Sequence, residues 1–519
     1  MELWFILLVS ISLCLLLRAF FNLLLPSLSP PFPPGPLRFP FFGSFRCLGK
    51  SLLQLEPILR SLHAKHGPIV TLPLPAIFTP LPAIFIADRS LALQAFVQNG
   101  AVFSDRPEPV PLARLIDVNL HTIRSSFYGP TWRLFRRNLT TEMLHPTRIK
   151  SFSGQRKWVL DMLLSRFRSD SESSKSIMVI DQLRYAMFCL LVFMCFGSRL
   201  DEKQIKDIEY VLHRFLLDFF KFNILNFWPR VTRILFRKRW EELRQLIKDR
   251  ENLIIPLIRA RKKAKEESEA FSGQVCYVDT LLDLELPDEK RKLEESEIVS
   301  ACSEFLDAGT DSTAATLQWI LANLVKYPNI QQRVVDEIRE VVGERDDKEV
   351  KQEDLNKLPY LKAVVLERLR RHPPTHFVLA HAVSEDVVLN GYLVPKKGTV
   401  NFMLAEMGWD PKVWEDPMEF KPERFLNGEW NNNGIEFNGS EAIFDIARNK
   451  EIKMMPFGLG RRMCPASNLA IFHLEYFVAN LIWNFEWKPA NGTTVDLSET
   501  QEFLVVMKNP LQVQLSPRL

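Results

Sequence analysis

Residues Met455–Ala466 read MPFGLGRRMCPA and place a single cysteine, Cys464, after two arginines and directly before a proline. Beyond Pro465 the apolar residues recur at intervals of three and four, which predicts a helix that starts near this proline. The unpaired amide groups and the positive dipole end of a helix start favour a thiolate over a thiol. Cys464 is therefore a metal ligand, a nucleophile or an inert buried thiol, and other parts of the chain must decide among these roles.

The bulk composition is that of a large globular protein. The 519 residues are 47% hydrophobic and 25% charged, and the net charge of +4 is too balanced to indicate a nucleic-acid partner. Seven cysteines are scattered along the chain without a CxxC pair, so neither a disulfide framework nor structural zinc is indicated. The middle of the sequence contains no linker, which favours one large catalytic domain in a reducing compartment.

The N-terminus carries the pattern of a membrane anchor. Residues Leu3–Leu17 are uncharged and Ala19–Leu25 form a second apolar run, with Arg18 between them. Together the two runs are long enough to cross a bilayer. Only Glu2 precedes them and the positive charges follow, which argues against a cleaved signal peptide. By the positive-inside rule, residues 1–25 are expected to be a single-pass anchor that leaves the rest of the chain cytosolic.

A proline-rich spacer follows the expected anchor. Seven prolines lie between Pro26 and Pro40, a density that is incompatible with a helix or a central strand. Residues 26–45 are therefore expected to form either a stiff extended hinge or a disordered tether. The remaining residues, 46–519, are expected to form the catalytic domain.

From about residue 50 onward the pattern predicts a mainly α fold with small β-sheets, an α+β class. The clearest strand segments are Ile69–Leu72 and Ala83–Ile86, and Gly129-Pro130 opens a helix. In that helix Trp132 and Arg136 are four residues apart and share one face. Taken alone, such a pair is more often a surface cation–π contact than a ligand contact.

Two further segments of the sequence have a recognisable composition, one rich in aromatic residues and one with charged residues at helical spacing. Six aromatic residues fall within Phe215–Trp228, where core packing is the default explanation and a membrane-dipping or substrate-entrance surface is the alternative. Glu367 and Arg370 are three apart on one helical face and are expected to form an ion pair. Arg424, between a proline and a phenylalanine in the sequence PERF, could complete a charge network with them.

The longest helical pattern runs from about Asp288 to Lys326, with Pro328 just beyond its end. Its middle, Ala308–Thr313, reads AGTDST, and these residues are poor choices inside a helix because their side chains compete for backbone hydrogen bonds. Apolar neighbours indicate that this polar island is buried. We expect it to distort the helix locally and to open a groove for water or a small ligand.

These motifs together resemble the cytochrome P450 family. They are Phe457-x-x-Gly460-x-Arg462-x-Cys464, the long helix with Ala308-Gly309-x-Asp311-Ser312, the ExxR at Glu367–Arg370 and the PERF at Pro422–Phe425. Their order matches the family, and the resemblance spans nearly the whole chain. The anchor, the proline hinge and Trp132-x-x-x-Arg136 are similar to the plant microsomal, A-type members.

The resemblance implies a haem b cofactor, iron protoporphyrin IX, held between the long helix and the cysteine loop. Cys464 would be the axial thiolate and the only protein ligand of the metal. Phe457 and Gly460 would shape the loop around it. Trp132, Arg136 and Arg462 would hold the haem propionates.

The same resemblance implies roles on the opposite face of the haem and beneath it. Asp311 and Ser312 would pass protons toward the oxygen-activating side, and Thr313 could share this relay. Glu367, Arg370 and Arg424 would form a structural network on the sulfur side.

Three departures from the family pattern bear on the site. Ala466 stands where a glycine is usual, and its methyl group would crowd the haem edge. Ser312 replaces the usual threonine and keeps the hydroxyl group. Ala380 replaces a frequent proline, and His381 could stand in for an arginine that contacts a propionate.

The expected function is a membrane-anchored monooxygenase that inserts one atom of O2 into a lipophilic small molecule, a plant secondary metabolite or lipid. The chain has no flavin domain, so electrons would come from NADPH through a separate flavoprotein reductase that docks near Arg133 and Arg137. The expected location is the endoplasmic reticulum membrane, with membrane lipid, substrate and O2 as further partners and no nucleic acid.

Alternatives remain at this stage. A hydroperoxide-rearranging haem-thiolate enzyme would not need the relay of Asp311 and Ser312, and a non-catalytic haem-binding membrane protein would need neither. A cysteine hydrolase lacks an evident histidine partner for Cys464. The substrate pocket is expected to be apolar and to be lined by residues in five segments: 119–127, 215–222, 301–305, 374–379 and 503–506.

Overall fold

The computed structural model describes residues 30–36, 52–72, 83–172, 176–226, 228–267, 274–343, 345, 349–426, 452–490 and 494–518. The expected anchor at residues 1–25 lies outside these ranges. Of the expected hinge, only residues 30–36 are described.

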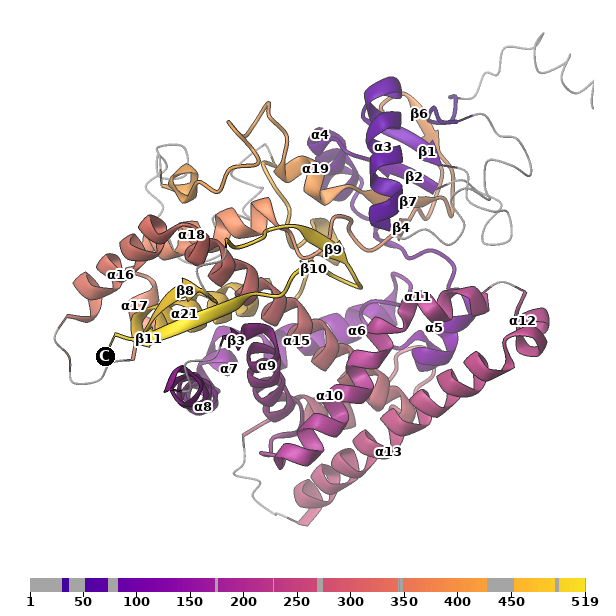
Figure 1. The fold of residues 1–519 in the computed structure, drawn as a ribbon. Coiled ribbons are helices and arrows are strands. Elements are labelled where there is room, and N and C mark those ends of the chain that lie inside the picture. Colours follow the sequence, from indigo (N-terminus) through magenta and orange to yellow (C-terminus); the bar gives the residue numbers. More distant parts are fainter. Residues whose placement is uncertain are drawn as a thin grey trace, which may run out of the picture.

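The chain forms a mainly helical body with small sheets, as predicted (Figure 1). Its α-helices are α3 (Leu52–His66), α4 (Arg89–Leu93), α5 (Pro111–Ile116), α6 (Pro130–Asn138), α7 (Pro146–Ser151), α8 (Ser153–Glu172), α9 (Val179–Phe196), α10 (Glu202–Leu217), α11 (Phe219–Asn223), α12 (Pro229–Leu235), α13 (Arg237–Glu267), α14 (Tyr277–Leu282), α15 (Glu295–Lys326), α16 (Pro328–Val342), α17 (Gln352–Leu355), α18 (Pro359–Arg371), α19 (Leu404–Gly408) and α21 (Ser467–Asn484). Short 3-10 turns cover Pro422–Phe425 and Gly460–Arg462.

The strands are short and form four small sheets. They are β1 (Ile69–Leu72), β2 (Ala83–Ile86), β3 (Ile177–Met178), β4 (His381–Ala382), β5 (Val387–Leu389), β6 (Tyr392–Val394), β7 (Thr399–Phe402), β8 (Phe485–Pro489), β9 (Glu499–Gln501), β10 (Val505–Met507) and β11 (Gln512–Pro517). The largest sheet has the order β1-β2-β7-β4 and pairs β2 with β7 in parallel. Both strand segments predicted from the sequence, β1 and β2, pair antiparallel in it.

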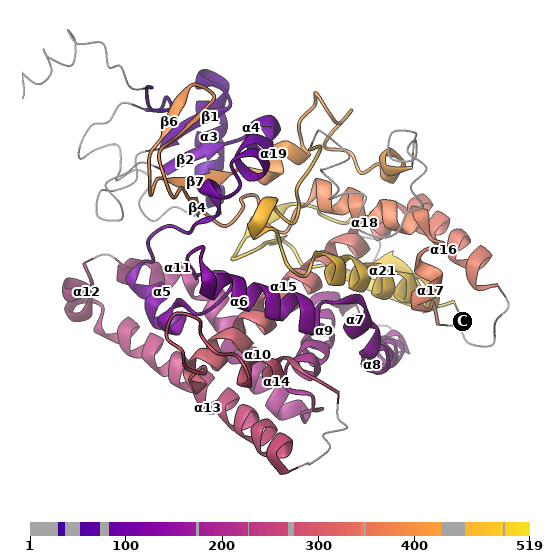
Figure 2. The same cartoon turned by 180° about the vertical axis from the view of Figure 1, so that it is seen from behind.

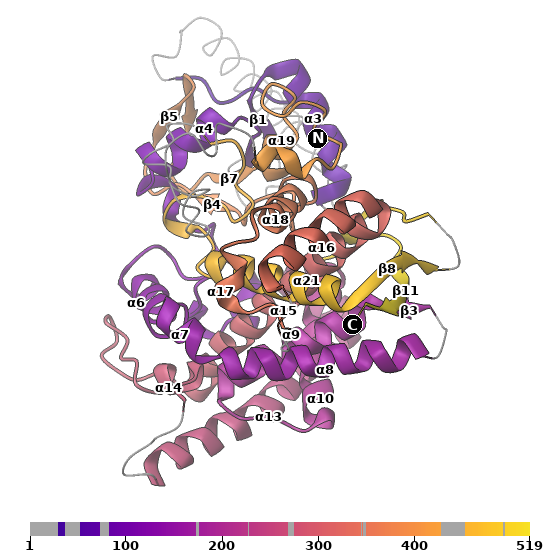
Figure 3. The same cartoon turned by 90° about the vertical axis from the view of Figure 1, so that its left-hand side faces the viewer.

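The helical core is built around α15, which crosses the centre of the molecule (Figures 1 and 3). Helices α9, α18 and α21 pack against α15, and one large apolar cluster joins them. Among the described residues, α9 is the one helix that is long and apolar enough to cross a membrane, and 78% of it is buried. Because this burial is inside the protein, α9 serves as a core helix.

The sheet β1-β2-β7-β4 and helices α3, α4 and α19 form a second region at one end of the molecule (Figure 2). The strands pair along β1-β2-β7, and the apolar side chains of β1 and β2 are buried on both faces of the sheet. The segment 30–36 is attached to this region. The N–H of Thr71 donates to the carbonyl of Pro34 at 2.8 Å, and the N–H of Leu393 donates to the carbonyl of Pro31 at 2.8 Å. The described part of the hinge is therefore extended and docked on the body.

The long helix differs from its prediction at its start and in its middle. It begins at Glu295 rather than near Asp288 and ends at Lys326 as expected. It remains α-helical through Ala308–Thr313, so the expected local distortion is not seen. The hydroxyl of Ser312 donates to the carbonyl of Ala308 one turn earlier, so this polar side chain is satisfied without breaking the helix, whereas the buried hydroxyl of Thr310 has no hydrogen-bond partner among the described residues.

Candidate functional site

The cysteine loop is held in shape by its own backbone. The N–H of Cys464 donates to the carbonyl of Phe457 at 2.9 Å, and the N–H of Met463 donates to the carbonyl of Gly460 at 3.1 Å. Helix α21 begins at Ser467, so Pro465 lies in the turn that leads into the helix. Burial raises the pKa of the Cys464 thiol, while the N–H of Ala466 donates to the sulfur and opposes this shift.

Gly460 is required by the geometry of this loop. Its φ is +72°, a conformation that favours glycine, and a Cβ atom there would lie 2.7 Å from the carbonyl oxygen of Phe96. The loop therefore passes directly against the backbone of the residue next to α4. Ala466, the departure from the family pattern, is accommodated as a partly buried residue that packs on the main apolar cluster.

Arg462 is directed from the cysteine loop into the body of the protein. Its guanidinium donates to the carbonyls of Ser104 at 2.8 Å, Ile123 at 3.0 Å and Ser126 at 2.7 Å, and it lies over the ring of Trp132 with its Cζ atom 4.8 Å from the ring centroid. Burial, and then the nearby charge of Arg106, lower the pKa of Arg462 to about 9. This arrangement needs a negative group to stabilise it.

Trp132 and Arg136 meet the cysteine loop from α6, as their shared face predicted. The indole Nε1 of Trp132 donates to the carbonyl of Ile123 at 3.2 Å, and Nη1 of Arg136 donates to the carbonyl of Met463 at 2.6 Å. Arg136 therefore contacts the residue directly before Cys464. Burial lowers the pKa of Arg136, and the nearby sulfur partly offsets this effect.

Arg106 belongs to the same cluster, although no sequence motif pointed to it. It donates to the carbonyls of Arg124, Leu379 and Ala380 at 2.8–3.0 Å, and burial lowers its pKa to about 10. His381 is buried nearby, with Nδ1 2.7 Å from the carbonyl of Phe103, and burial lowers its pKa to about 3. His381 is therefore neutral, and the positive charge in this corner comes from the arginines.

Among the described residues, no carboxylate lies within ion-pair distance of these arginines. In the described part of the chain, Arg106, Arg136 and Arg462 have no salt bridge within 4 Å. Their donors go to backbone carbonyls instead. We call these three residues the arginine cluster; it is a half-buried, cationic group that would bind acidic groups of a ligand.

Helix α15 presents a mixed face near its centre. Ala308 is exposed and Ser312, one turn later, is half-buried, although nearly all residues of the C-terminal half of the helix are buried. The hydroxyl of Ser312 donates to the carbonyl of Ala308 at 2.6 Å. Thr313 is buried, with only 7% of its surface exposed. The accessible hydroxyl of the island is thus that of Ser312.

Asp311 faces away from that surface, toward α9 and α10. Its Oδ1 lies 3.0 Å from Nε of Arg184 and 3.3 Å from Nδ1 of His213. The nearby Glu209 has a raised pKa because of burial, and the charge of Asp311 also contributes. Asp311 therefore lies within ion-pair distance of one guanidinium and one imidazole, in a pairing that the sequence did not predict.

A cavity of about 100 Å³ lies beside this pair. It is enclosed by α9, α10, α15 and the β9–β10 hairpin. Its walls are mainly apolar and are lined by Ile180, Arg184, His213, Leu216, Leu217, Asp311, Ala315, Gln318, Glu502, Phe503, Leu504, Val506, Met507 and Pro510. The segments expected at 215–222 and 503–506 contribute to it, whereas those expected at 119–127, 301–305 and 374–379 do not line this cavity.

The comparisons with known proteins give the family. The family model described as Cytochrome P450 matches residues 33–516. "Cytochrome P450 89A9" of Arabidopsis thaliana is 49% identical over 500 residues, which cover 94% of each chain. The chain belongs to the cytochrome P450 family. It is accordingly a haem monooxygenase, and its cofactor is haem b.

Other relatives of this cytochrome P450 are more distant. The "Sarpagan bridge enzyme" of Gelsemium sempervirens is 28% identical over 93% of this chain and 91% of its own length. A "Flavonoid 3',5'-hydroxylase" of Solanum melongena is 27% identical over 94% of this chain and 91% of its own length. A solved zebra fish cytochrome P450 with progesterone has a TM-score of 0.70 at 21% identity, covering 89% of this chain and 99% of that one, and it confirms the fold.

The charge network expected in this P450 is present, with Glu367 and Arg370 fully buried and Arg424 at its partly exposed edge. Arg370 contacts both oxygens of Glu367, with Nε at 2.7 Å and Nη2 at 2.8 Å, and Arg424 Nε lies 3.3 Å from Glu367. Glu367 and Arg370 have no exposed side-chain surface. Arg370 also donates to the carbonyls of Gly408 and Pro417, so the network ties α18 to the segment after α19.

Arg106, Arg184 and His213 are the functional candidates that the sequence motifs missed. Arg106 stands in the loop segment Asp105-Arg106-Pro107, and Arg184 and His213 each follow a leucine in the helices α9 and α10. The sequence offers one indication of such residues, because a charged side chain that is buried among apolar residues must have a partner. This indication predicts that the residue is paired, but it does not identify the partner.

Proposed function

We propose that Cys464 is the axial thiolate ligand of the haem in a monooxygenase that oxidises a lipophilic small molecule. The observation that carries this proposal is the arginine cluster, Arg106, Arg136 and Arg462, gathered around the loop of a half-buried cysteine. Haem b brings an iron that takes a thiolate and two propionates that take guanidinium groups. The donor set of this site fits both parts of the cofactor.

The residues that would hold the haem follow from their contacts. Cys464 would bind the iron, and a hydrogen bond from the N–H of Ala466 would stabilise the negative charge on its sulfur. Arg462 and Arg106, with the indole of Trp132, would receive the propionates. Arg136 would support the loop from below through the carbonyl of Met463. Phe457 and Gly460 would act through the backbone, the first as the acceptor for the N–H of Cys464 and the second by its conformation.

Haem supplies the activation of O2 when it is bound, and α15 would supply the protons. The hydroxyl of Ser312 lies on the half-buried face next to Ala308 and can hold a proton there. Asp311, one residue earlier, would exchange protons with solvent through the cavity beside Arg184 and His213. Thr313 is enclosed and would contribute only to packing.

Electrons would come from an NADPH-dependent flavoprotein reductase. Arg133, Arg137 and Arg461 are exposed on the side of the cysteine loop, and the guanidinium groups of Arg133 and Arg461 both contact the hydroxyl of Tyr128. This basic surface would attract an acidic partner and increase its association rate at low salt. This basic surface lies near Cys464, because its residues belong to α6 and to the cysteine loop.

The substrate class follows from the cavity and from the relatives. The cavity is lined mainly by leucine, isoleucine, valine, methionine and phenylalanine, so a lipophilic molecule would bind there. The relatives include a flavonoid hydroxylase of Solanum melongena and a sarpagan bridge enzyme of Gelsemium sempervirens. A plant secondary metabolite or a lipid therefore fits best.

The protein would work at the endoplasmic reticulum membrane, anchored by residues 1–25 and extended by the hinge at 26–45. Residues 46–519 would form the catalytic domain on the cytosolic side. An apolar surface beside α12 supports a membrane contact: Trp228, Ile234 and Leu235 are 63%, 80% and 69% exposed. The adjoining arginines and lysine at positions 230, 233, 237 and 238 are exposed and match anionic lipid headgroups. In Figure 1, α12 and the segment 30–36 lie toward the same edge of the molecule.

The proposal is tested by the absorption of the reduced, CO-bound protein. A thiolate-ligated haem gives a strongly red-shifted band, and we expect Cys464→Ser to abolish this band. Cys302→Ser, a buried cysteine within α15, is the matched control and should keep the band. A red-shifted band in Cys464→Ser, or an ordinary histidine-type spectrum in the intact protein, would show that Cys464 is not the ligand.

A further inference from the structure

The β9–β10 hairpin forms one wall of the cavity beside Asp311. Strands β9 and β10 pair antiparallel, with Val505 opposite Gln501 and Met507 opposite Glu499. The tip of the hairpin, Glu502–Leu504, lies among the lining residues of the cavity. The position of this tip therefore sets the shape of the cavity.

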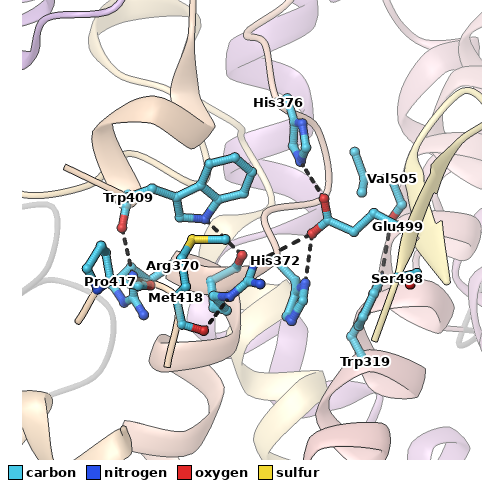
Figure 4. A network of polar contacts seen from close by, with 12 residues as sticks. Trp319, Arg370, His372, His376, Trp409, Pro417, Met418, Ser498, Glu499 and Val505 are labelled. Atoms are coloured by element: carbon cyan, nitrogen blue, oxygen red, sulfur yellow. Dashed lines mark hydrogen bonds and ion pairs between the residues drawn. The ribbon is translucent and has the colours of Figure 1, made fainter. Parts of the chain in front are cut away.

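The base of the hairpin is fixed by the carboxylate of Glu499 (Figure 4). Its Oε1 lies 2.8 Å from Nδ1 of His372, and its Oε2 lies 3.2 Å from Nε2 of His376. Arg371 adds a longer ion pair, with Nη1 3.9 Å from Oε1. One carboxylate thus contacts three basic side chains, Arg371 at the end of α18 and His372 and His376 in the segment that follows it.

The second strand is attached to the same segment. The N–H of Val505 donates to the carbonyl of Pro374 at 2.9 Å, and the indole of Trp319 in α15 donates to the carbonyl of Val505 at 3.3 Å. The ring of His372 stacks on Trp319, with centroids 4.1 Å apart. Both strands of the hairpin therefore rest on residues 372–376, and Figure 4 shows Glu499 and Val505 of the hairpin beside His372, His376 and Trp319.

His376 extends the network to the other end of the molecule. Its Nδ1 lies 2.8 Å from Oε2 of Glu56 in α3, and only 3% of its side chain is exposed. Arg60 contacts both Glu56 and Glu406 of α19. A single imidazole thus joins the sheet region, through α3, to the hairpin at the cavity.

The charges around His376 favour its protonated form. The groups that face it are Glu56 and Arg60 from α3, Glu406 from α19, Glu499 from β9 and Arg371 from α18. Burial alone would lower the pKa of His376, but hydrogen bonds to Glu499 and Glu56 overcome it and raise the pKa to about 9. His372 has a pKa lowered to about 4 by burial and is neutral. At neutral pH, one imidazolium bridges two carboxylates.

We propose that Glu499 and His376 are positioning residues that hold the tip of the β9–β10 hairpin over the substrate cavity and so determine which lipophilic molecules bind there. The inference rests on the proposed function of that cavity. Without the charge of Glu499, the base of the hairpin is no longer held in place, and the tip can then move relative to the cavity. We call the contacts of Glu499 with His372 and His376, and of His376 with Glu56, the latch.

The test uses two nitrogen ligands of different size and the haem-loaded full chain. Imidazole is small enough to bind without reaching the hairpin, whereas clotrimazole is bulky and must pack against the cavity walls. Binding of each is followed by the shift in the haem absorption spectrum. We expect Glu499→Gln to weaken clotrimazole about tenfold, as loss of one buried charged contact would, and to change imidazole affinity by less than about twofold.

Two control variants distinguish loss of the latch from a general loss of structure. Glu486→Gln removes an exposed, lysine-paired carboxylate on β8 and should leave both affinities unchanged. Glu56→Gln removes the other partner of His376 and should act in the same direction as Glu499→Gln. Equal weakening of both probes, or an unchanged clotrimazole affinity in Glu499→Gln, would overturn the inference. Absence of any imidazole shift in the wild-type protein would instead contradict the proposed function.

Two further readouts do not depend on turnover. Hydrogen exchange of the amides in 499–507 should become about tenfold faster in Glu499→Gln, with α15 unchanged. In the wild-type protein, clotrimazole affinity should fall as pH rises through about 9, where His376 loses its charge. His376→Gln should remove this pH dependence, and imidazole affinity should stay level from pH 8 to 10. A clotrimazole profile that is identical in His376→Gln and wild type would refute the role of His376.

Discussion

Ser312 and Thr313 are adjacent in sequence but have different surroundings. Ser312 is half-buried beside the exposed Ala308 and shares a hydrogen bond with its carbonyl, whereas Thr313 is enclosed by the core. Both residues carry a hydroxyl group, so the sequence alone could not choose between them as a proton donor. The choice depends on which side of α15 faces the open surface, and that is set by packing.

The relay can be tested at this pair of residues. We expect Ser312→Ala to keep its haem, because its side chain bonds only to its own helix. Product formation should fall by a factor on the order of a hundred, typical of a lost general acid, while NADPH consumption is diverted to peroxide. The measurement is the ratio of peroxide formed to NADPH consumed with a reductase. Thr313→Val is the matched control and should stay coupled; the reverse result would assign the relay to Thr313.

Single-residue roles are easiest to predict where the residues are close in sequence. Cys464, Arg462 and Gly460 belong to one short loop, so their spacing alone is enough to propose them as haem-binding residues. Asp311 was identified as an acid, but its partners, Arg184 and His213, come from two other helices. Such pairings depend on how α9 and α10 pack on α15, and a residue type cannot reveal them.

At the scale of elements, the segment Phe215–Trp228 divides between both of its explanations. Phe215 and Phe222 are buried in an apolar cluster with α13, as core packing predicts. Trp228 at the end of the segment is exposed and joins the apolar surface of α12. An aromatic run indicates burial or a membrane contact, but it does not tell where along the run one environment gives way to the other.

The surface of α12 can be tested in the full chain reconstituted in phospholipid bilayers. We expect an environment-sensitive fluorophore on Ile234→Cys to emit at shorter wavelength and to be quenched by nitroxide lipids, because this side chain should enter the acyl region. Met418→Cys carries the same label at another exposed apolar position and should remain in water. Equal emission from the two labelled positions would mean that α12 does not touch the membrane.

Element boundaries were the least predictable part of the fold. Helix α15 ends at the expected Lys326, because Pro328 stops it, but it begins seven residues later than its pattern suggested. Its cap is Glu294, whose position is fixed by a carboxylate of the next turn that also receives Arg291. Arg291, Glu294 and Glu297 make these contacts, but in the hydrophobic pattern of the sequence they resemble any polar residues on the surface of a helix.

At the scale of the whole molecule, buried titratable groups make the fold sensitive to alkaline pH. Desolvation raises the pKa of Asp307 to about 8, and two carboxylates raise the pKa of His376 to about 9. The folded state is therefore stabilised by the proton on Asp307 and by the proton on His376. Both stabilising contributions are lost as pH rises toward the pKa of each group in the folded state. Buried histidines with lowered pKa values, such as His473, no longer contribute above pH 6.5, because they are neutral in both states.

We therefore expect the holoenzyme to lose stability continuously between pH 6.5 and 9. Each group contributes about 1.4 kcal/mol per pH unit within its own window, which extends to about pH 8 for Asp307 and about pH 9 for His376. The measurement is the midpoint of thermal unfolding across this range. Asp307→Asn should flatten the profile up to pH 8 only, and His376→Gln should flatten it up to pH 9, because each removes one titration. A wild-type midpoint that stays level from pH 6.5 to 9 would show that neither group is held in its unusual protonation state by the fold.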